Sequence, residues 1–421
     1  EASVEKKTIR AIAPHLAEPL GFVFPAYRKT GRPLWQLRVG VKIYDLLCGG
    51  RNFQPSRGFT REETLLSLPS LNPDGLLGSV RYFDALTNDA RLVIDTLRSA
   101  AAHDAAVCNH LRFHNAYRAG DAWHCELEDQ LAGETFTVHA RTIVNATGPW
   151  AQQVPHSSVN LRLSKGIHVV VDRRLLPVSE AVVITEGKRI LFLIPWGERV
   201  IVGTTDTDYH ADPEQVRVEP SDVAYVLRTV NEFIPHLRLR ENDIISSWAG
   251  LRPLIANPDG SPSDISRAHQ IVSPEPGWWD VAGGKLTTYR LMAEQTVDQL
   301  GRFLRVSTRR CRTAAEPLLD PSLAAGYSGI VPPVFSREAV LHYVGHEWAL
   351  HLDDVMLRRS SWHYYHMDAP RLAKQTATWM AELLGWSDAQ RERELAAYRL
   401  ATGRDVTATQ SAPLRGAGVE P

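Results

Sequence analysis

Apolar and polar residues alternate along the chain with two periods, one typical of helices and one typical of strands. The helical period predicts an opening of helix, loop and helix, with the second helix between Pro33 and Gly49. A loop rich in Pro, Gly and Arg then follows to about Leu77. Ser221 is the expected N-cap of a later helix. That helix is predicted in the segment 219–235, and two more helices are predicted at 87–103 and 286–300.

Short apolar runs bounded by turn residues predict strands. From 106 to 144 they favour an antiparallel group followed by one buried strand. Four more strands are predicted from 159 to 205, in GIHVVVD, AVVITE, ILFLIPWG and RVIVGTTD, and IISSWAGLRPLI then resumes extended structure. Strands that alternate with helices in this way predict an α/β or α+β fold built on a mixed sheet.

The strand pattern stops after about Pro333. Three amphipathic helices are predicted beyond it, in SREAVLHYVGHEWALHLDDVML, APRLAKQTATWMAELLGW and SDAQRERELAAYRLAT, each begun by an N-cap residue or a proline. We therefore expect region 1–333 to carry the strands and 334–405 to form a separate helical domain. Residues 406–421 contain few bulky apolar groups and are expected to be disordered.

Composition excludes several classes of protein. The 47 Lys and Arg against 48 Asp and Glu leave a net charge of −1, so no global field attracts nucleic acid. The four cysteines lack metal-type spacing, which predicts a reducing compartment without a disulfide framework or a zinc site. No apolar run approaches the ~18 residues of a membrane span. The start EASVEKKTIR has neither a signal-peptide pattern nor a methionine, so Glu1 is not expected to be the natural start.

Three segments that resemble metal or ligand motifs are expected to be structural. His346 and His351 in HEWALH are five residues apart and diverge on a helix, unlike the metalloprotease pattern, which predicts a helix surface. The aromatic cluster SSWHYYH is expected to serve packing, and TTDTDYH is expected to be a strand end. The sequence therefore predicts no metal site.

Two glycine-containing turns are candidates for ligand contact. TIVNATGPWA is a β-branched strand that runs into Thr147 and Gly148, whose small size lets the backbone approach a ligand, although such turns are common in α/β proteins. In GGKLTTYR a glycine pair precedes a helix start beside Lys285, where amide hydrogens, the positive dipole end and a lysine favour an anion. The alternative is a plain glycine turn with an exposed lysine.

Two further side chains matter only if they converge. Arg252 lies at an apolar strand end, where its planar fork suits a phosphate, a carboxylate or a structural salt bridge. His168 and Val170 lie on the opposite strand face from Ile167. A strand histidine is more often structural, but beside Arg252 and Lys285 it could take a proton from an alcohol of an anionic substrate.

The ordered set NATGPWA, LSKGIHVVV, IPWGERVIVGTTDTDY, GLRPL and GGKLTTYR resembles the FAD-dependent glycerol-3-phosphate dehydrogenases of the aerobic, membrane-associated type. LRVGVKIYDLL, NDARLVI and HEWALHLDDVMLRRSSW resemble the same family, so the likeness extends to about residue 400. The family implies a dinucleotide-binding-type fold with a mixed-sheet substrate domain. It also implies a GxGxxG turn for the FAD pyrophosphate, which we expect upstream of Glu1 because the sequence contains none.

The resemblance implies roles for individual residues. Arg252 and Lys285 would hold the substrate phosphate or stabilise an oxyanion, with Arg290 as a further candidate for the same anion. His168 would take the C2 hydroxyl proton as hydride passes to flavin N5. The residues implied to contact FAD are Thr147, Gly148, Gly283, Gly284, Leu286 and Thr287.

The implied activity is oxidation of sn-glycerol 3-phosphate to dihydroxyacetone phosphate, with electrons passed to quinone by a cytoplasmic enzyme peripheral to the membrane. Two alternatives remain open: an oxidase that uses dioxygen, and a non-catalytic remnant that cannot hold FAD. The sequence also leaves the oligomeric state open, a homodimer included.

Overall fold

The structure is a computed structural model that describes residues 1–28, 33–47, 52–187, 189–256, 268–307, 309–324 and 326–403. The chain divides into two compact units. The first comprises Glu1–Pro333 with Tyr364–Met367, and the second comprises Val334–His363 with Asp368–Pro421. The tail 406–421, for which disorder was expected, lies outside the described residues.

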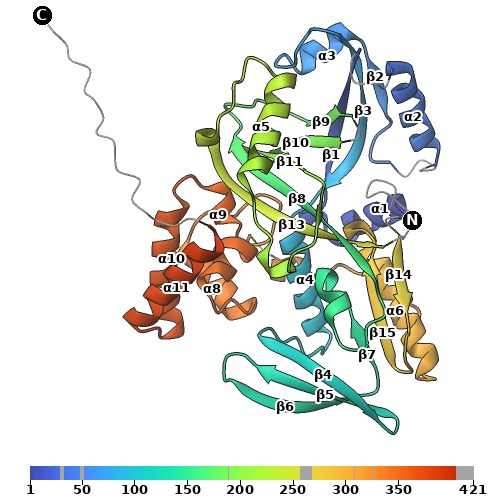
Figure 1. The fold of residues 1–421 in the computed structure, drawn as a ribbon, viewed down its shortest axis with the longest axis vertical. Helices are drawn as coiled ribbons and strands as arrows, with labels where there is room; N and C mark the ends of the chain where they lie inside the picture. Colours follow the sequence, from blue (N-terminus) through green and yellow to red (C-terminus); the bar gives the residue numbers. More distant parts are fainter. Residues whose placement is uncertain are drawn as a thin grey trace, which may run out of the picture. The chain divides into compact units, whose positions relative to one another are not determined.

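The first unit is built on a large mixed sheet in the order β12-β8-β11-β10-β9-β1-β3-β2, with β13 also paired to β8 (Figure 1). β1 and β9 are parallel and the other neighbours are antiparallel, which confirms the predicted mixed sheet. The strands are β1 (Glu18–Tyr27), β2 (Arg57–Phe59), β3 (Leu76–Leu86), β8 (Leu161–Asp172), β9 (Ala181–Glu186), β10 (Arg189–Trp196), β11 (Arg199–Gly203), β12 (Thr207–Tyr209) and β13 (Ile244–Ile255).

Helices surround this sheet. The predicted helices are present, but Glu219 rather than Ser221 is the N-cap of α5, because the helix already begins at Pro220. The α-helices of the first unit are α1 (Ala2–Ile12), α2 (Leu34–Leu47), α3 (Arg61–Ser67), α4 (Asp89–Ala102), α5 (Pro220–Phe233), α6 (Tyr289–Phe303) and α7 (Pro321–Ala324). The 3-10 turns are η1 (Pro14–Leu16), η2 (Gly148–Gln153), η3 (Pro213–Gln215), η4 (Glu241–Asp243) and η6 (Leu286–Thr288).

The main core lies between α5 and one face of the sheet. Ile167 and Val169 of β8 are buried there with Val226 and Val230 of α5. Val170 packs in a separate cluster on the other side of β8. The alternation of β8 thus confirms that His168 and Val170 face away from Ile167, and it leaves His168 on the face that α5 does not cover.

The sequence prediction missed β1, β2 and α3, which fall in segments taken for loops, and β3, most of which lies in a stretch to which no element was assigned. β1 contains Pro19 and Pro25, which read as strand breakers. The parallel pairing of β1 with β9 involves only Phe22 and Val23, so Pro25 lies beyond it and interrupts no bond to β9. Pro19 and Pro25 both lie opposite β3 residues, Ala85 and Ser79, so they are compatible with the sheet because they fall outside the short segment that pairs with β9.

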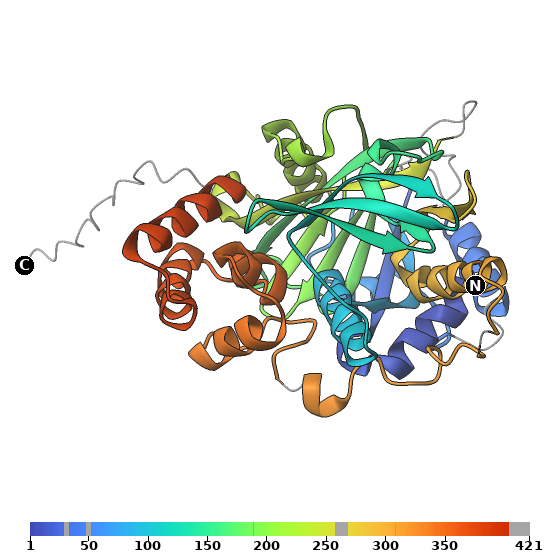
Figure 2. The ribbon, with the colours of Figure 1, turned by 90° about the horizontal axis from the view of Figure 1, so that it is seen from below.

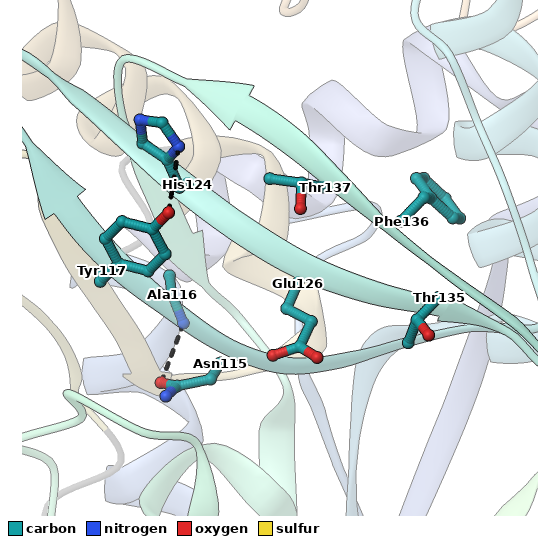
Figure 3. A pocket seen from close by; sticks show the side chains of 8 residues that line it. All are labelled: Asn115, Ala116, Tyr117, His124, Glu126, Thr135, Phe136 and Thr137. Atoms are coloured by element: carbon teal, nitrogen blue, oxygen red, sulfur yellow. Dashed lines mark hydrogen bonds between the residues drawn. The ribbon is translucent and has the colours of Figure 1, made fainter.

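Two smaller sheets complete the first unit. β14 (His269–Val272), β15 (Trp278–Gly283) and β7 (Ile143–Asn145) form one, and β4 (Leu111–Ala119), β5 (Ala122–Asp129) and β6 (Glu134–Ala140) form the predicted antiparallel group. β7 is less buried than expected, since Val144 is 39% exposed. A shallow pocket of about 190 Å³ lies on the outer face of β4–β6, where Tyr117 and His124 stack (Figure 3). Figure 2 shows this sheet from another side.

The second unit is helical, as its sequence pattern predicted. Its first predicted helix is broken, however: α8 ends at His346, and Trp348 has a left-handed φ of 53°. His351 therefore lies beyond the helix, so the predicted helix surface for HEWALH is wrong there; its Nδ1 pairs with Glu394 at 3.0 Å. Trp362 is buried among aromatic rings, as expected. The helices of this part of the chain are α8 (Arg337–His346), η7 (Asp354–Arg359), α9 (Trp362–Tyr365), of which the last two residues belong to the first unit, α10 (Ala369–Leu384) and α11 (Asp388–Ala401).

Candidate functional site

His168 stands on the uncovered face of β8, between two neighbouring strands. The antiparallel registers place Gly203 of β11 and Trp248 of β13 directly beside it. Its ring stacks on Trp248, with ring centroids 5.3 Å apart and planes 21° from parallel. Nδ1 of His168 is buried and has no hydrogen-bond partner within the described ranges. Since buried polar atoms are nearly always bonded, this nitrogen is a candidate to meet a ligand.

Arg252 reaches toward this position from β13. It pairs in register with Ser164, and its guanidinium extends over Gly166, where a Cβ atom would come within 2.7 Å of Nη2. Nη2 donates to Thr204 Oγ1 at 2.8 Å and Nη1 donates to the Thr205 carbonyl at 3.3 Å. The missing side chain at Gly166 therefore provides the space in which Arg252 lies.

The segment after β11 holds Arg252 without enclosing it. Asp206 Oδ1 lies 3.5 Å from Arg252 Nη1, and the arginine side chain remains 31% exposed. TTDTDYH follows the end of β11, in keeping with the prediction, but it also contains the short strand β12, and its first residues position the arginine. The sequence signal was present in Thr204, Thr205 and Asp206, but only the register between β11, β8 and β13 shows which residue they contact.

Burial, and then the positive charge of Arg252, lower the pKa of His168 from 6.5 to about 4. The imidazole is therefore neutral at pH 7, with a lone pair that can accept a proton. The electrostatics of the site fit a proton acceptor beside an anion-binding cation.

The lowered pKa of His168 predicts a pH-dependent stability. Because the folded-state pKa of about 4 lies below the unfolded value of 6.5, unfolding takes up a proton between these values. The stabilisation is complete above pH 6.5 and is lost as the pH falls toward 4, by at most about 3 kcal/mol. Urea unfolding of the wild type and His168→Gln at pH 7 and pH 5 measures this. The free-energy difference between the two proteins should shrink or reverse at pH 5; a constant difference would contradict the assignment.

Gly203 should tolerate no side chain. A Cβ atom there would overlap the ring of His168 and lie 2.7 Å from the Ile167 carbonyl. We expect Gly203→Ala to destabilise the protein by about 1–3 kcal/mol, as overpacking does, and to shift the NMR signals of the His168 ring as it leaves Trp248. Gly250→Ala is the matched control, because a Cβ at Gly250 meets nothing within 4 Å. Equal stabilities of the two variants would refute this packing.

The two glycine turns meet at one sheet edge. β7 and β15 are parallel, with Asn145 beside Asp280, so the carboxyl ends of the two strands lie at the same edge of the sheet. Thr147 and Gly148 follow β7, and Gly283 ends β15, with Gly284 and Lys285 directly after it. The carboxyl edge of parallel strands is where open α/β sheets bind ligands.

Asn145 and Asp280 fix this edge, and the sequence analysis gave neither a role. Asn145 donates to Asp280 Oδ1 and to the Ala151 carbonyl, both at 2.9 Å. Its own oxygen accepts from Thr147 Oγ1 at 2.7 Å. Asp280 is fully buried and also accepts from the Ser158 amide. This network holds the Thr147 turn in register with β15.

The glycine pair at the end of β15 forms a turn, as predicted, and both glycines adopt backbone conformations that other residues rarely adopt. Gly283 and Gly284 have left-handed φ values of 71° and 83°. Lys285 then caps η6, with its side chain exposed, and its ammonium group forms no hydrogen bond or ion pair within the described part of the chain. Leu286 and Thr287 line a cavity of about 60 Å³ next to α1. The structure thus brings His168 and Arg252 together on β8 and β13. Lys285 lies instead in the turn after β15, among the residues that were expected to contact FAD.

Arg290 does not face an open site, contrary to its proposed role as an anion ligand. Its guanidinium is buried and donates to both carboxylate oxygens of Glu5 at 2.7 Å, and it also bonds Glu294 at 2.5 Å and Thr313 at 3.1 Å. These carboxylates already satisfy the charge. Arg290 ties α6 to α1 and has a structural role here.

Known proteins resemble the chain over most of its length. Residues 6–299 match the family described as FAD dependent oxidoreductase, and residues 330–391 match the C-terminal domain of alpha-glycerophosphate oxidase. Glycerol-3-phosphate dehydrogenase 2 of Mycobacterium tuberculosis is 31% identical over 452 residues, which cover 94% of this chain and 77% of the relative. The chain belongs to the FAD-dependent glycerol-3-phosphate dehydrogenase family. It is an oxidoreductase, and the cofactor of its family is FAD.

Two further family members are similar. The aerobic glycerol-3-phosphate dehydrogenase of Bacillus subtilis is 35% identical over 329 residues, which cover 76% of this chain and 59% of the relative. The X-ray structure of glycerol-3-phosphate dehydrogenase from Bacillus halodurans complexed with FAD has a TM-score of 0.77 at 25% identity, and the match covers 96% of this chain and 85% of that one. The fold class predicted from the sequence is therefore confirmed.

The sheet edge has two features that suit a bound FAD, open space at one turn and a helix N-terminus at the other. A Cβ atom at Gly148 would meet nothing within 4 Å, so this turn borders open space. The first amides of η6 and α6 form a helix N-terminus at the other turn, where polar ring atoms and negative charge are favoured.

Among the helices that the structure describes, none combines the length and the apolar character of a membrane span.

Proposed function

We propose that this family member oxidises sn-glycerol 3-phosphate to dihydroxyacetone phosphate with FAD and passes the electrons to quinone at a membrane surface. The names of its relatives support the substrate. The observation that carries the proposal is the pairing of a neutral, unbonded imidazole with a partly exposed guanidinium on one sheet face. We assign catalysis to region 1–333 and treat 334–405 as an accessory helical domain.

Each residue has a distinct part in the proposed reaction. Arg252 binds the phosphate or the developing C2 oxyanion through its guanidinium, and Lys285 adds a second positive charge from the η6 turn. His168 accepts the proton of the C2 hydroxyl on its unbonded Nδ1. Thr147, Gly148, Gly283, Gly284, Leu286 and Thr287 hold the flavin ring.

The reaction balances as a two-electron oxidation. The C2–H bond breaks with both electrons, the C2–O bond becomes a carbonyl, and the hydroxyl proton moves to His168. FAD, when bound, supplies the hydride acceptor. Neutral His168 is suited to the proton transfer because its lowered pKa leaves it unprotonated before substrate arrives.

The first experiment is the visible absorption spectrum of the purified chain after incubation with FAD and desalting, followed by anaerobic addition of sn-glycerol 3-phosphate. A retained flavin band that bleaches with this substrate, and not with glycerol, is expected. A retained band without bleaching would overturn the substrate assignment. Loss of the band on desalting would instead favour the non-catalytic remnant.

The electron acceptor needs its own measurement. Reoxidation of the reduced flavin by a short-chain quinone should be faster than reoxidation by dioxygen. The match of residues 330–391 to a domain of alpha-glycerophosphate oxidase is the observation that favours the alternative, an oxidase. Rapid reoxidation in air with stoichiometric hydrogen peroxide would establish that second function.

A further inference from the structure

α2 has two apolar stripes, and only one of them packs against the protein. Leu34, Leu37 and Val41 face inward and join a cluster with Val80 of β3 and Ala26 of β1. The second stripe faces outward and is largely exposed: Trp35 64%, Val39 49%, Ile43 51% and Leu46 79%. A surface helix normally presents polar residues on its outer face, so the second stripe needs an explanation.

The exposed residues form one continuous line along the helix. They follow the spacing i, i+4, i+8 and i+11, which at 100° per residue places them within an arc of about 80°. Isolated exposed apolar residues are common on proteins, but a line over three turns of one helix is a surface of defined shape. We call Trp35, Val39, Ile43 and Leu46 the outer stripe.

Basic residues border the outer stripe on one side. Arg38 donates to the Phe59 carbonyl at 3.3 Å and Lys42 donates to the Ser56 carbonyl at 3.2 Å; neither pairs with a carboxylate within the described ranges. Asp45 is the one acidic residue in the sequence of α2. Its oxygens accept from Ser56 and Asn52; burial opposes ionisation, but these hydrogen bonds and the charge of Lys42 lower the pKa of Asp45. Asp45 is therefore ionised and offsets part of the charge of Lys42, while Arg38 adds a positive charge that is not paired with a carboxylate in the described ranges.

We propose that α2 lies in the interface of an anionic lipid bilayer, with the outer stripe among the acyl chains and Arg38 and Lys42 at the phosphate groups. This inference deepens the membrane part of the proposed function. Interfacial helices combine such an apolar line, including a tryptophan, with basic residues beside it. A second copy of the chain fits less well, since a stable interface covers roughly 800 Å² on each partner, more than four side chains of one helix expose.

The test is flotation of the FAD-loaded full chain with vesicles of equal parts phosphatidylglycerol and phosphatidylcholine. Binding should be at least tenfold weaker to vesicles of phosphatidylcholine alone and should weaken as salt increases. Trp35→Ser with Ile43→Ser should reduce binding at least tenfold. Arg38→Gln with Lys42→Gln should remove most of the salt dependence.

Matched substitutions on helices other than α2 test whether any loss of exposed apolar or charged side chains reduces vesicle binding. Val93→Ser with Leu400→Ser changes exposed apolar residues of other helices, and Arg228→Gln with Lys374→Gln removes exposed charges. Both pairs should bind vesicles as the wild type does. Thermal unfolding establishes that all variants are folded.

Three outcomes would overturn the inference: no binding of the wild type, equal binding by the outer-stripe variant, or a dimer that dissociates only in that variant. Anaerobic flavin bleaching by sn-glycerol 3-phosphate, measured without vesicles, tests the proposed activity separately. It should be unchanged in every α2 variant. A protein that binds vesicles through α2 without bleaching would refute the activity and leave the docking surface supported.

Discussion

Replacing His168 with alanine should slow flavin reduction by sn-glycerol 3-phosphate on the order of a hundredfold or more, the usual contribution of a general base. Binding of the substrate should change little. Nδ1 of His168 is a buried nitrogen with no hydrogen-bond partner among the described residues, and the ring is neutral at neutral pH. It can accept a proton there in the tautomer that carries its own proton on Nε2. Anaerobic rapid mixing at several substrate concentrations separates the reduction rate constant from the dissociation constant.

A second variant and a control distinguish chemistry from packing. His168→Gln keeps much of the volume beside Trp248 and should lose the same rate, whereas a purely structural histidine would be partly rescued by it. His139→Ala, on exposed β6, is the control and should retain the wild-type rate. If His168→Ala weakened binding and slowed reduction equally, His168 would be a structural residue.

The sequence was sufficient to predict which face of a strand a residue lies on. It was not sufficient to predict which residues of the adjacent strands lie beside it. Period-two alternation correctly separated His168 from Ile167, because each face of β8 packs in a different cluster. The role of Gly203 depends on His168 of β8 lying opposite it, and the role of Gly166 depends on Arg252 reaching it from β13. That register is a tertiary property, and no local pattern encodes it.

The arginines show the same limit. Arg252 and Arg290 both follow short motifs that suit an anion, and the sequence offered no means to separate them. In the structure Glu5, distant along the chain, binds Nε and Nη2 of Arg290, and Glu294 and Thr313 take Nη1, while Arg252 keeps an exposed face near His168. An ion pair between remote residues is set by the packing of α1 on α6, which periodicity cannot reveal.

Replacing Arg252 with alanine should lower kcat/KM for sn-glycerol 3-phosphate at least tenfold, on the order of 1.4 kcal/mol or more of lost transition-state stabilisation. Lys285→Ala should have an effect of similar size if it binds the same anion. Arg252→Lys should recover only part of the loss, because it keeps the charge without the planar fork. Steady-state kinetics of the FAD-loaded protein measure all three.

Arg162→Ala is the matched control for Arg252. Both arginines lie on the same sheet face, pair with an aspartate and are about one-third exposed: Arg162 29% with Asp208, Arg252 31% with Asp206. Arg162 is six residues from His168 along β8, about 20 Å at the rise of a strand, so its loss should leave kcat/KM unchanged. Equal losses in both variants would refute a specific role for Arg252.

Arg252→Ala also has a readout that does not depend on turnover. Its positive charge helps to lower the pKa of His168, so the variant should have a higher His168 pKa, between about 4 and the unperturbed 6.5. NMR titration of the His168 ring measures the shift, and Arg162→Ala should not produce it. A large loss of activity with an unchanged His168 pKa would mean that Arg252 acts on the substrate without sensing the histidine, and the two would then not form one electrostatic unit.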